Sequence, residues 1–175
     1  MQQQSGTTPR VLVVMRHAKA EQGGPTDFER HLSERGRGEA QAAGRWLATQ
    51  GVVPDHVLVS AAVRTIETWE AVAEAAGWQV DASHDRGLYD ASPEMALDLV
   101  REIPADVRTA VVIGHNPTIA YVAHLLDDGD GDPEVATQMA LGYPTGALTV
   151  FEHDGVWADL EPASARVVAF HVGRA

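Results

Sequence analysis

Short apolar runs rich in β-branched residues recur along this chain, and stretches of helical composition separate them. The runs predict strands at 11–15, 57–59, 110–113, 148–151 and 166–172. The runs at 11–15 and 148–151 lack the polar alternation of a half-exposed strand, which is typical of strands buried on both faces of a largely parallel sheet. Such a sheet needs helices on both faces, and this requirement constrains the fold more than any other feature.

The segments between the strands carry start and stop signals for helices. The signals predict helices from Ser33 to Gln50 with Gly51 as the stop, from a Ser60 cap to about Ala76, from Ser92-Pro93 to a residue before Pro104, and from Asn116-Pro117 through 118–126. Strand and helix therefore alternate, as they do in α/β folds. We predict a three-layer α/β/α sandwich around a mostly parallel central sheet.

Length and composition favour a single domain. A chain of 175 residues buries about 70% of its unfolded surface on folding, so it needs neither a disulfide nor a structural metal. No internal repeat or long linker divides it, and we predict one domain over residues 10–175. Residues 1–9 are polar and predict a flexible N-terminal tail. The chain has no Cys, which excludes a thiolate nucleophile and a zinc ribbon.

The charge balance excludes several classes of partner. The chain has 13 Lys+Arg against 25 Asp+Glu and a net charge of -12, so its overall field repels nucleic acid and anionic membrane surfaces. We expect no nucleic-acid partner and no membrane partner. The apolar run at 11–15 is too short for a signal peptide or a membrane span, and we predict a cytoplasmic protein. Any phosphate chemistry must depend on a local cluster of cations.

Three of the predicted strands end in polar residues that their apolar runs do not explain. The carboxyl ends of parallel strands meet at one edge of the sheet, where open α/β folds bind ligands. Arginine offers planar, charged donors to phosphate oxygens, and histidine can attack phosphorus or donate to it. The pattern favours a phosphoryl site, although each residue alone is more typical of a loop histidine or a solvated arginine. The three strand ends carry Arg16-His17, Ser60 with Arg64 about one helical turn later, and Gly114-His115-Asn116.

Four blocks of the sequence resemble those of a known family. Residues 15–21 (MRHAKAE) resemble the opening R-H-G/A motif of the histidine phosphatase superfamily, which is phosphoglycerate-mutase-like. The later blocks 59–65 (VSAAVRT) with Thr68, 87–90 (GLYD) and 113–117 (IGHNP) resemble, in order, the SixA-type branch of phosphohistidine phosphatases. Residues 27–36 and 144–150 are also similar to that branch. The resemblance covers residues 11–157 and implies the three-layer fold without a large lid insertion, in a histidine phosphatase domain.

The resemblance implies a mechanism that the residue types support. His17 is the expected nucleophile and becomes transiently phosphorylated, while Arg16, Arg64 and His115 hold the phosphoryl oxygens. The neighbouring arginines should lower the pKa of His17 and keep it neutral near pH 7. We expect no cofactor and no metal, because the arginines supply the positive charge.

Three further residues are expected to contribute to the site. Arg30, in the 27–36 stretch, is predicted to add a phosphate contact, and Asn116 is predicted to orient His115. Asp90 falls where the wider superfamily has the acid that protonates the leaving group. The alternative for Asp90 is a place near the cap of the helix that begins at Pro93. The choice matters because a departing alkoxide needs a proton, whereas a departing imidazole needs less help.

These expectations define a metal-independent phosphatase that removes phosphate from phosphohistidine in a partner protein. One alternative keeps the chemistry and changes the substrate to a small phosphomonoester. A second alternative is a catalytically inactive phosphate-binding or interaction module.

The acidic run at 127–132 resembles the start of a calcium loop, but the positions that need Gly and Glu hold Pro133 and Met139. We therefore predict an acidic surface loop there.

Overall fold

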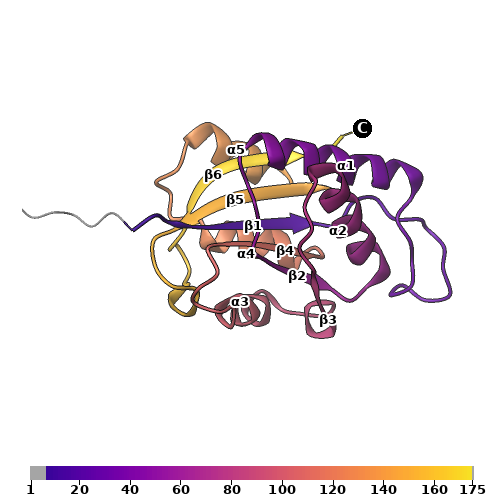
Figure 1. The fold of residues 1–175 in the computed structure, drawn as a ribbon, viewed down its shortest axis with the longest axis horizontal. Coiled ribbons are helices and arrows are strands. Elements are labelled where there is room, and N and C mark those ends of the chain that lie inside the picture. The colour runs from indigo at the N-terminus through magenta and orange to yellow at the C-terminus, as the bar shows by residue number, and fades with distance from the viewer. Residues whose placement is uncertain (1–6, 175) are drawn as a thin grey trace, which may run out of the picture.

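Within residues 7–174, the part of the chain that the computed structural model describes, six strands form one sheet in the order β3-β2-β4-β1-β5-β6 (Figure 1). β1 is parallel to β4, β4 to β2, and β2 to β3, whereas β5 is antiparallel to both of its neighbours. The sheet is therefore mostly parallel, as predicted. The strands are β1 (Arg10–Arg16), β2 (His56–Ser60), β3 (Ser83–Asp85), β4 (Thr109–Gly114), β5 (Ala147–His153) and β6 (Arg166–Val172).

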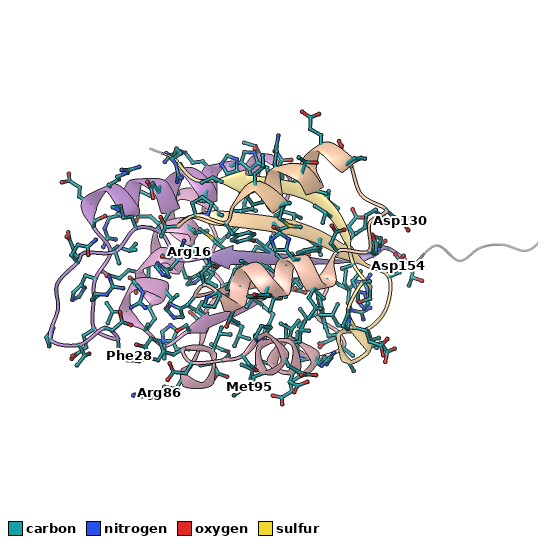
Figure 2. All side chains as sticks on the ribbon, turned by 180° about the vertical axis from the view of Figure 1, so that it is seen from behind. Arg16, Phe28, Arg86, Met95, Asp130 and Asp154 are labelled. Carbon is teal, nitrogen blue, oxygen red and sulfur yellow. The ribbon has the colours of Figure 1, made fainter. Side chains whose placement is uncertain are left out.

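Helices cover both faces of this sheet, which confirms the predicted three layers. Figure 1 views the side of α1 and α2, and Figure 2 views the opposite side with α4 in front of the sheet. Along β1, Val13 and Met15 pack with the first pair of helices, while Leu12 and Val14 pack with the other group, because successive side chains of a strand point to opposite faces. The helices are α1 (Glu34–Thr49), α2 (Val63–Ala76), α3 (Pro93–Arg101), α4 (Thr118–Leu126) and α5 (Pro133–Leu141), with short 3₁₀ turns η1 (Arg86–Leu88) and η2 (Trp157–Asp159).

The helix starts agree with the sequence signals at α1 and α3 but differ at α2 and α4. At α4 the predicted cap is Asn116, whereas Pro117 is the cap residue and the helix begins at Thr118. Ser33 Oγ accepts from the N–H of Gly36 at the start of α1, and Ser92 Oγ accepts from Met95 at the start of α3. The predicted Ser60 cap is wrong, because Ala62 is the cap residue of α2 and makes no side-chain cap bond. Ser60 is still the last residue of β2, and its hydroxyl is bonded elsewhere.

Besides the two 3₁₀ turns, β3 and α5 have no counterpart in the prediction. β3 has three mostly exposed polar residues, so it has no apolar run by which it can be recognised. α5 follows the predicted acidic loop, whose last residue, Asp132, accepts from the N–H of Glu134 and caps the helix. The acidic run thus contains a helix cap as well as a loop, because a short aspartate side chain satisfies the free N–H groups of a first turn.

The predicted tail of residues 1–9 falls largely outside the described chain, because residues 1–6 and 175 are not part of it. β1 begins at Arg10, immediately after that predicted tail. Within residues 7–174, every helix is too short or too polar to cross a bilayer.

The contact between α1 and α2 depends on Gly44. A methyl group at this position would lie 2.2 Å from the backbone oxygen of Val72. Backbone cannot yield as a flexible side chain does, so the two helices approach closely only where α1 lacks a Cβ.

We predict that Gly44→Ala lowers the free energy of unfolding by about 1–3 kcal/mol, as overpacking in a core does. Chemical denaturation monitored by circular dichroism measures the change. Gly23→Ala is the control, since a methyl group there has nothing within 4 Å. Equal stability of the two variants would contradict the close approach of α1 and α2.

Candidate active site

The carboxyl ends of β1, β2 and β4 lie side by side and bring the predicted residues together. Arg16, the last residue of β1, is paired with Gly114, the last residue of β4. The N–H of His17 donates to the oxygen of Gly114 at 3.1 Å. His17 and His115, which follow these two strands, therefore lie close together. The centroids of the two imidazole rings are 5.3 Å apart. Figure 2 labels Arg16 at this end of the molecule.

His17 is held in one tautomer. Its side chain is buried, and Nδ1 lies 2.7 Å from the oxygen of Ala18. A carbonyl oxygen only accepts, so Nδ1 carries the proton. Nε of Arg64 donates to Nε2 at 3.4 Å, which is consistent with a free lone pair there. The N–H of Ala18 donates to Thr68 Oγ1, and the oxygen of His17 accepts from Gly146, so the backbone on both sides of the ring is fixed.

Arg64 connects the elements of the site. It lies in the first turn of α2 and is 5% exposed. Its Nη2 donates to Nδ1 of His115 at 3.3 Å and to Oδ2 of Asp27 at 3.1 Å, and its Nη1 donates to the oxygen of Asp27 at 2.7 Å. The guanidinium therefore joins both histidines to the loop between β1 and α1.

Asp27 is the anionic partner of these cations. Its carboxylate accepts from Arg64, from Nε of Arg30 at 3.0 Å and from the hydroxyl of Tyr89 at 2.6 Å. These bonds, with that of Tyr89 the largest cause, lower the pKa of Asp27 to about 2. Asp27 is thus ionised at neutral pH and cannot act there as a proton donor.

His115 is oriented by Ser60 at the end of β2. Because Arg64 donates to Nδ1 of His115, Nε2 carries the proton and donates to Ser60 Oγ at 2.7 Å. The same oxygen accepts from the N–H of Ala62. Ser60 is therefore the residue that holds the ring, and the predicted role of Asn116 in orienting His115 has no matching hydrogen bond. Asn116 instead donates to the oxygen of Tyr143 at 2.8 Å and accepts from Ala120 in α4.

Arg16 has a hydrogen-bond donor that its present contacts do not use. Its Nη1 donates to the oxygen of Tyr143 at 3.2 Å, while its Nε is buried and has no hydrogen-bond partner in the described structure. A buried N–H without a partner costs free energy. An anion that accepts from this group removes that cost, so Arg16 is suited to bind one.

Both histidines have lowered pKa values and stay neutral at pH 7 and down to a pH well below it. Burial is the main cause that lowers the pKa of His17 to about 4, and Arg64 and Arg16 lower it further against the opposing bond to Ala18. Burial, the other histidine and Arg64 lower the pKa of His115 to about 3. The predicted effect of the arginines is therefore present, but burial is larger. A neutral imidazole with a free lone pair is a nucleophile.

Sequence reasoning missed Asp27, Tyr89 and Phe28. The ring of Tyr89 meets that of His115 edge-on at 5.3 Å, and the ring of Phe28 meets Tyr89 edge-on at 5.0 Å. All three belong to the blocks 27–36 and 87–90, so membership of a recognised block was the available signal. Asp90, the next residue after Tyr89, is exposed and makes none of the hydrogen bonds of the site within residues 7–174.

Comparisons with known proteins agree with this geometry. Residues 12–94 match the family model of the histidine phosphatase superfamily (branch 1). The uncharacterized protein Rv1276c of Mycobacterium tuberculosis is 36% identical over 162 residues, which is 91% of this chain and 100% of the relative.

Two solved structures are similar along almost their whole length. SixA of Nakamurella multipartitia, a candidate phosphohistidine phosphatase, is 31% identical with a TM-score of 0.85, and the match covers 98% of this chain and 100% of that one. SixA of Agrobacterium tumefaciens, with the same candidate activity, is 27% identical with a TM-score of 0.78 over 94% of this chain and 99% of that one.

The fold and the paired histidines and arginines at its edge define a phosphatase, and this chain belongs to the histidine phosphatase superfamily. Within that superfamily it is SixA-like, with the phosphoglycerate-mutase-like fold of the SixA structures.

The protonation of His17 is directly testable. We predict that NMR titration of ¹⁵N-labelled histidine shows His17 as the Nδ1–H tautomer with a pKa of about 4, instead of the ordinary 6.5. Arg64→Met should raise this pKa, because a positive neighbour is lost. The unfolded chain takes up protons at the ordinary pKa, so between pH 6.5 and 4 the free energy of unfolding should fall as the pH falls. Titration of His17 near 6.5 would contradict the buried, arginine-flanked site.

Proposed function

We propose that this protein is a metal-independent phosphatase that removes phosphate from phosphohistidine in a partner protein, through a phosphorylated His17. The observation that carries the proposal is the fixed tautomer of His17. Its Nδ1–H is bonded to the oxygen of Ala18, and Nε2 is unprotonated and accepts a long hydrogen bond from Nε of Arg64. The nucleophilic atom is thus prepared before substrate binds.

In the first step, Nε2 of His17 attacks phosphorus in line with the leaving nitrogen of the carrier histidine. The new N–P bond forms as the old one breaks, and the electron pair of the broken bond goes to the carrier ring. The positive charge that develops on His17 is stabilised through Nδ1–H and the oxygen of Ala18. Arg16, Arg64 and His115 hold the phosphoryl oxygens, and the arginines supply the charge that a metal supplies elsewhere.

In the second step, water attacks the phosphorus of phosphorylated His17. The N–P bond breaks, Nε2 regains its lone pair, and both protons of the water remain on the phosphate product. His115 takes part through its Nδ1, which faces Arg64 in the free protein. A bound phosphate dianion favours a proton on Nδ1, because an opposite charge raises the pKa of an imidazole. His115 then donates to a phosphoryl oxygen while Ser60 keeps the ring in place.

The ionised Asp27 supports phosphohistidine as the substrate. Tyr89 and the arginines hold its pKa at about 2, so this carboxylate cannot protonate a departing alkoxide. A phosphohistidine ring that is protonated on its other nitrogen leaves as neutral imidazole and needs no acid. The ring of Tyr89 beside His115, with the ring of Phe28 against that of Tyr89, provides an aromatic wall for such a flat leaving group.

The proposal gives Arg30 and Asn116 secondary places in the substrate-binding set. Arg30 is bonded to Asp27 beside Arg64, so its guanidinium can turn toward a phosphoryl oxygen. Asn116 follows His115 and fixes the start of α4 through Ala120. Asp90 remains the candidate acid for substrates with an alkoxide leaving group.

A labelling experiment tests this function. A ³²P-phosphohistidine carrier domain and, separately, an aryl phosphate are mixed with the protein and quenched in alkaline denaturant, since phosphohistidine is labile in acid. We expect the carrier to lose label, label to appear briefly on His17, and His17→Ala to abolish both events while phosphate still binds. His84→Ala is the control, because His84 is an exposed histidine on β3.

Other outcomes select the alternatives. Turnover of the aryl phosphate through His17 with several carriers left intact would replace the protein substrate by a small phosphomonoester. Labelling from neither compound would favour an inactive phosphate-binding module. An active His17→Ala protein would overturn the mechanism.

The carboxylates have separable roles that mutation can reveal. We predict that Asp27→Asn lowers kcat for phosphohistidine by about tenfold, since the hydrogen bonds of a charged group to Arg64 and Tyr89 are weakened. Asp90→Asn should change this rate by less than about twofold, because the imidazole leaves without an acid. Steady-state kinetics on phosphohistidine and on an alkyl phosphate measure both effects. A larger loss in Asp90→Asn than in Asp27→Asn on phosphohistidine would contradict the assignment.

A further inference from the structure

The outward side of α4 is apolar although the chain as a whole is strongly acidic. The helix has nine residues, TIAYVAHLL, without Lys, Arg, Asp or Glu. Ile119, Val122, Ala123 and Leu126 face the core. Tyr121 is 63% exposed and Leu125 is 38% exposed, and with exposed Pro117 and His124 they form what we call the α4 stripe.

The α4 stripe borders a shallow hollow of about 410 Å³. The hollow is lined by Asn116, Pro117, Ala120, Tyr121 and His124. A second hollow of about 440 Å³ lies between α4 and α3, where its lining includes Leu125, Leu97 and Pro162 together with the charged side chains of Glu94 and Arg101. A concave and mainly apolar surface such as the first hollow is typical of a binding surface.

This surface begins at the active site. Asn116 follows His115 directly, and the N–H of Ile119 donates to the oxygen of His115 at 2.8 Å. Tyr121 lies one helical turn, about 5 Å, beyond Pro117. Figure 2 shows α4 crossing the face of the sheet from the end where Arg16 and Phe28 are labelled toward the end of Asp130. Anything that covers the α4 stripe therefore also borders the mouth of the site.

A protein substrate must touch the surface around this mouth. His17 is 7% exposed, and a phosphohistidine side chain is short, so the carrier backbone has to come close. A specific complex buries about 800 Å² on each partner, which is more than the phosphoryl site alone offers. The contact must extend onto a flank of the site, and the flanks formed by the loop before α1 and by α4 differ in charge.

The flank formed by the loop before α1 is rich in charge, with exposed Lys19, Glu21, Asp27 and Glu29 and partly exposed Arg30. The flank formed by α4 exposes no formal charge between Pro117 and Leu126. A net charge of -12 repels an anionic phosphoprotein, and desolvating carboxylates at an interface is costly. The α4 side therefore allows close approach at a lower electrostatic cost than the loop before α1, and Tyr121 is a residue type enriched at the centre of interfaces.

We propose that the α4 stripe is the docking surface for the phosphohistidine-bearing protein, and that this partner presents apolar side chains beside its phosphohistidine. The inference deepens the proposed function and depends on it. The hydroxyl of Tyr121 and the ring of His124 add polar contacts to a mainly apolar interface.

Kinetics with three substrates separate docking from chemistry. The substrates are a phosphohistidine carrier domain, phosphoimidazole with the same leaving group, and an aryl phosphate. We expect Tyr121→Asp to lower kcat/KM for the carrier by about tenfold or more, as loss of an interface hot spot does, and to leave both small substrates unchanged. Tyr121→Phe should retain most of the carrier activity. Val53→Asp is the matched control, since Val53 is 69% exposed and precedes β2, at the edge of the sheet opposite to the site.

Each outcome has one meaning. An unchanged kcat/KM of Tyr121→Asp for the carrier overturns the docking surface while the proposed function survives. Equal losses on all three substrates overturn it as well, because the variant then damages the site itself. If sedimentation shows a dimer that Tyr121→Asp dissociates, a second copy of this chain is the occupant and the docking proposal is wrong. If wild-type protein hydrolyses the aryl phosphate but no phosphohistidine compound, the proposed function fails first and the docking proposal fails with it.

Discussion

The site depends on one buried guanidinium. Arg64 donates to Nε2 of His17, to Nδ1 of His115 and to Asp27, so it determines how both rings are protonated and keeps the loop before α1 against the site. A buried positive charge is tolerated only where its donors are satisfied. Asp27 partly meets that requirement, and in the proposed reaction a phosphoryl group between the arginines adds acceptors of the same charge. The neutral state of both histidines follows from this arrangement and from burial.

The fold makes this arrangement possible by ending three buried strands at one edge. β1, β4 and β2 are held in parallel register by a core on both faces, so the residues after them have little freedom. Hydrogen bonds to Thr68 Oγ1 and from the N–H of Gly146 fix the backbone around His17, and Ser60 holds His115. The cations of the site can attract a phosphate although the chain as a whole is acidic. A charge in contact with a buried phosphate interacts with it more strongly than the distant, solvent-screened charges of the surface.

Much of the fold could be predicted because the apolar runs and the caps at Ser33 and Ser92 are local signals. β3 and α5 could not, since β3 is short, polar and at the edge, and α5 buries little apolar surface apart from Met139. Ser60 was misjudged for a related reason. A serine before a helix satisfies the cap pattern locally, but β2 extends through it and its hydroxyl reaches a histidine 55 residues away. The order of the strands in the sheet places the histidine beside this hydroxyl.

The sequence by itself determined the α/β class, the strand ends that carry Arg16, His17, Arg64 and His115, and the family resemblance, because these depend on periodicity and on short motifs. Only the tertiary structure decided which nitrogen of each histidine holds the proton, which carboxylate faces the arginines, and which side of the mouth is free of charge. Each of these depends on distances between segments far apart in the chain. A sequence pattern carries residue types and spacings, whereas hydrogen-bond partners and burial, which move a pKa or orient a ring, exist only once the segments have packed.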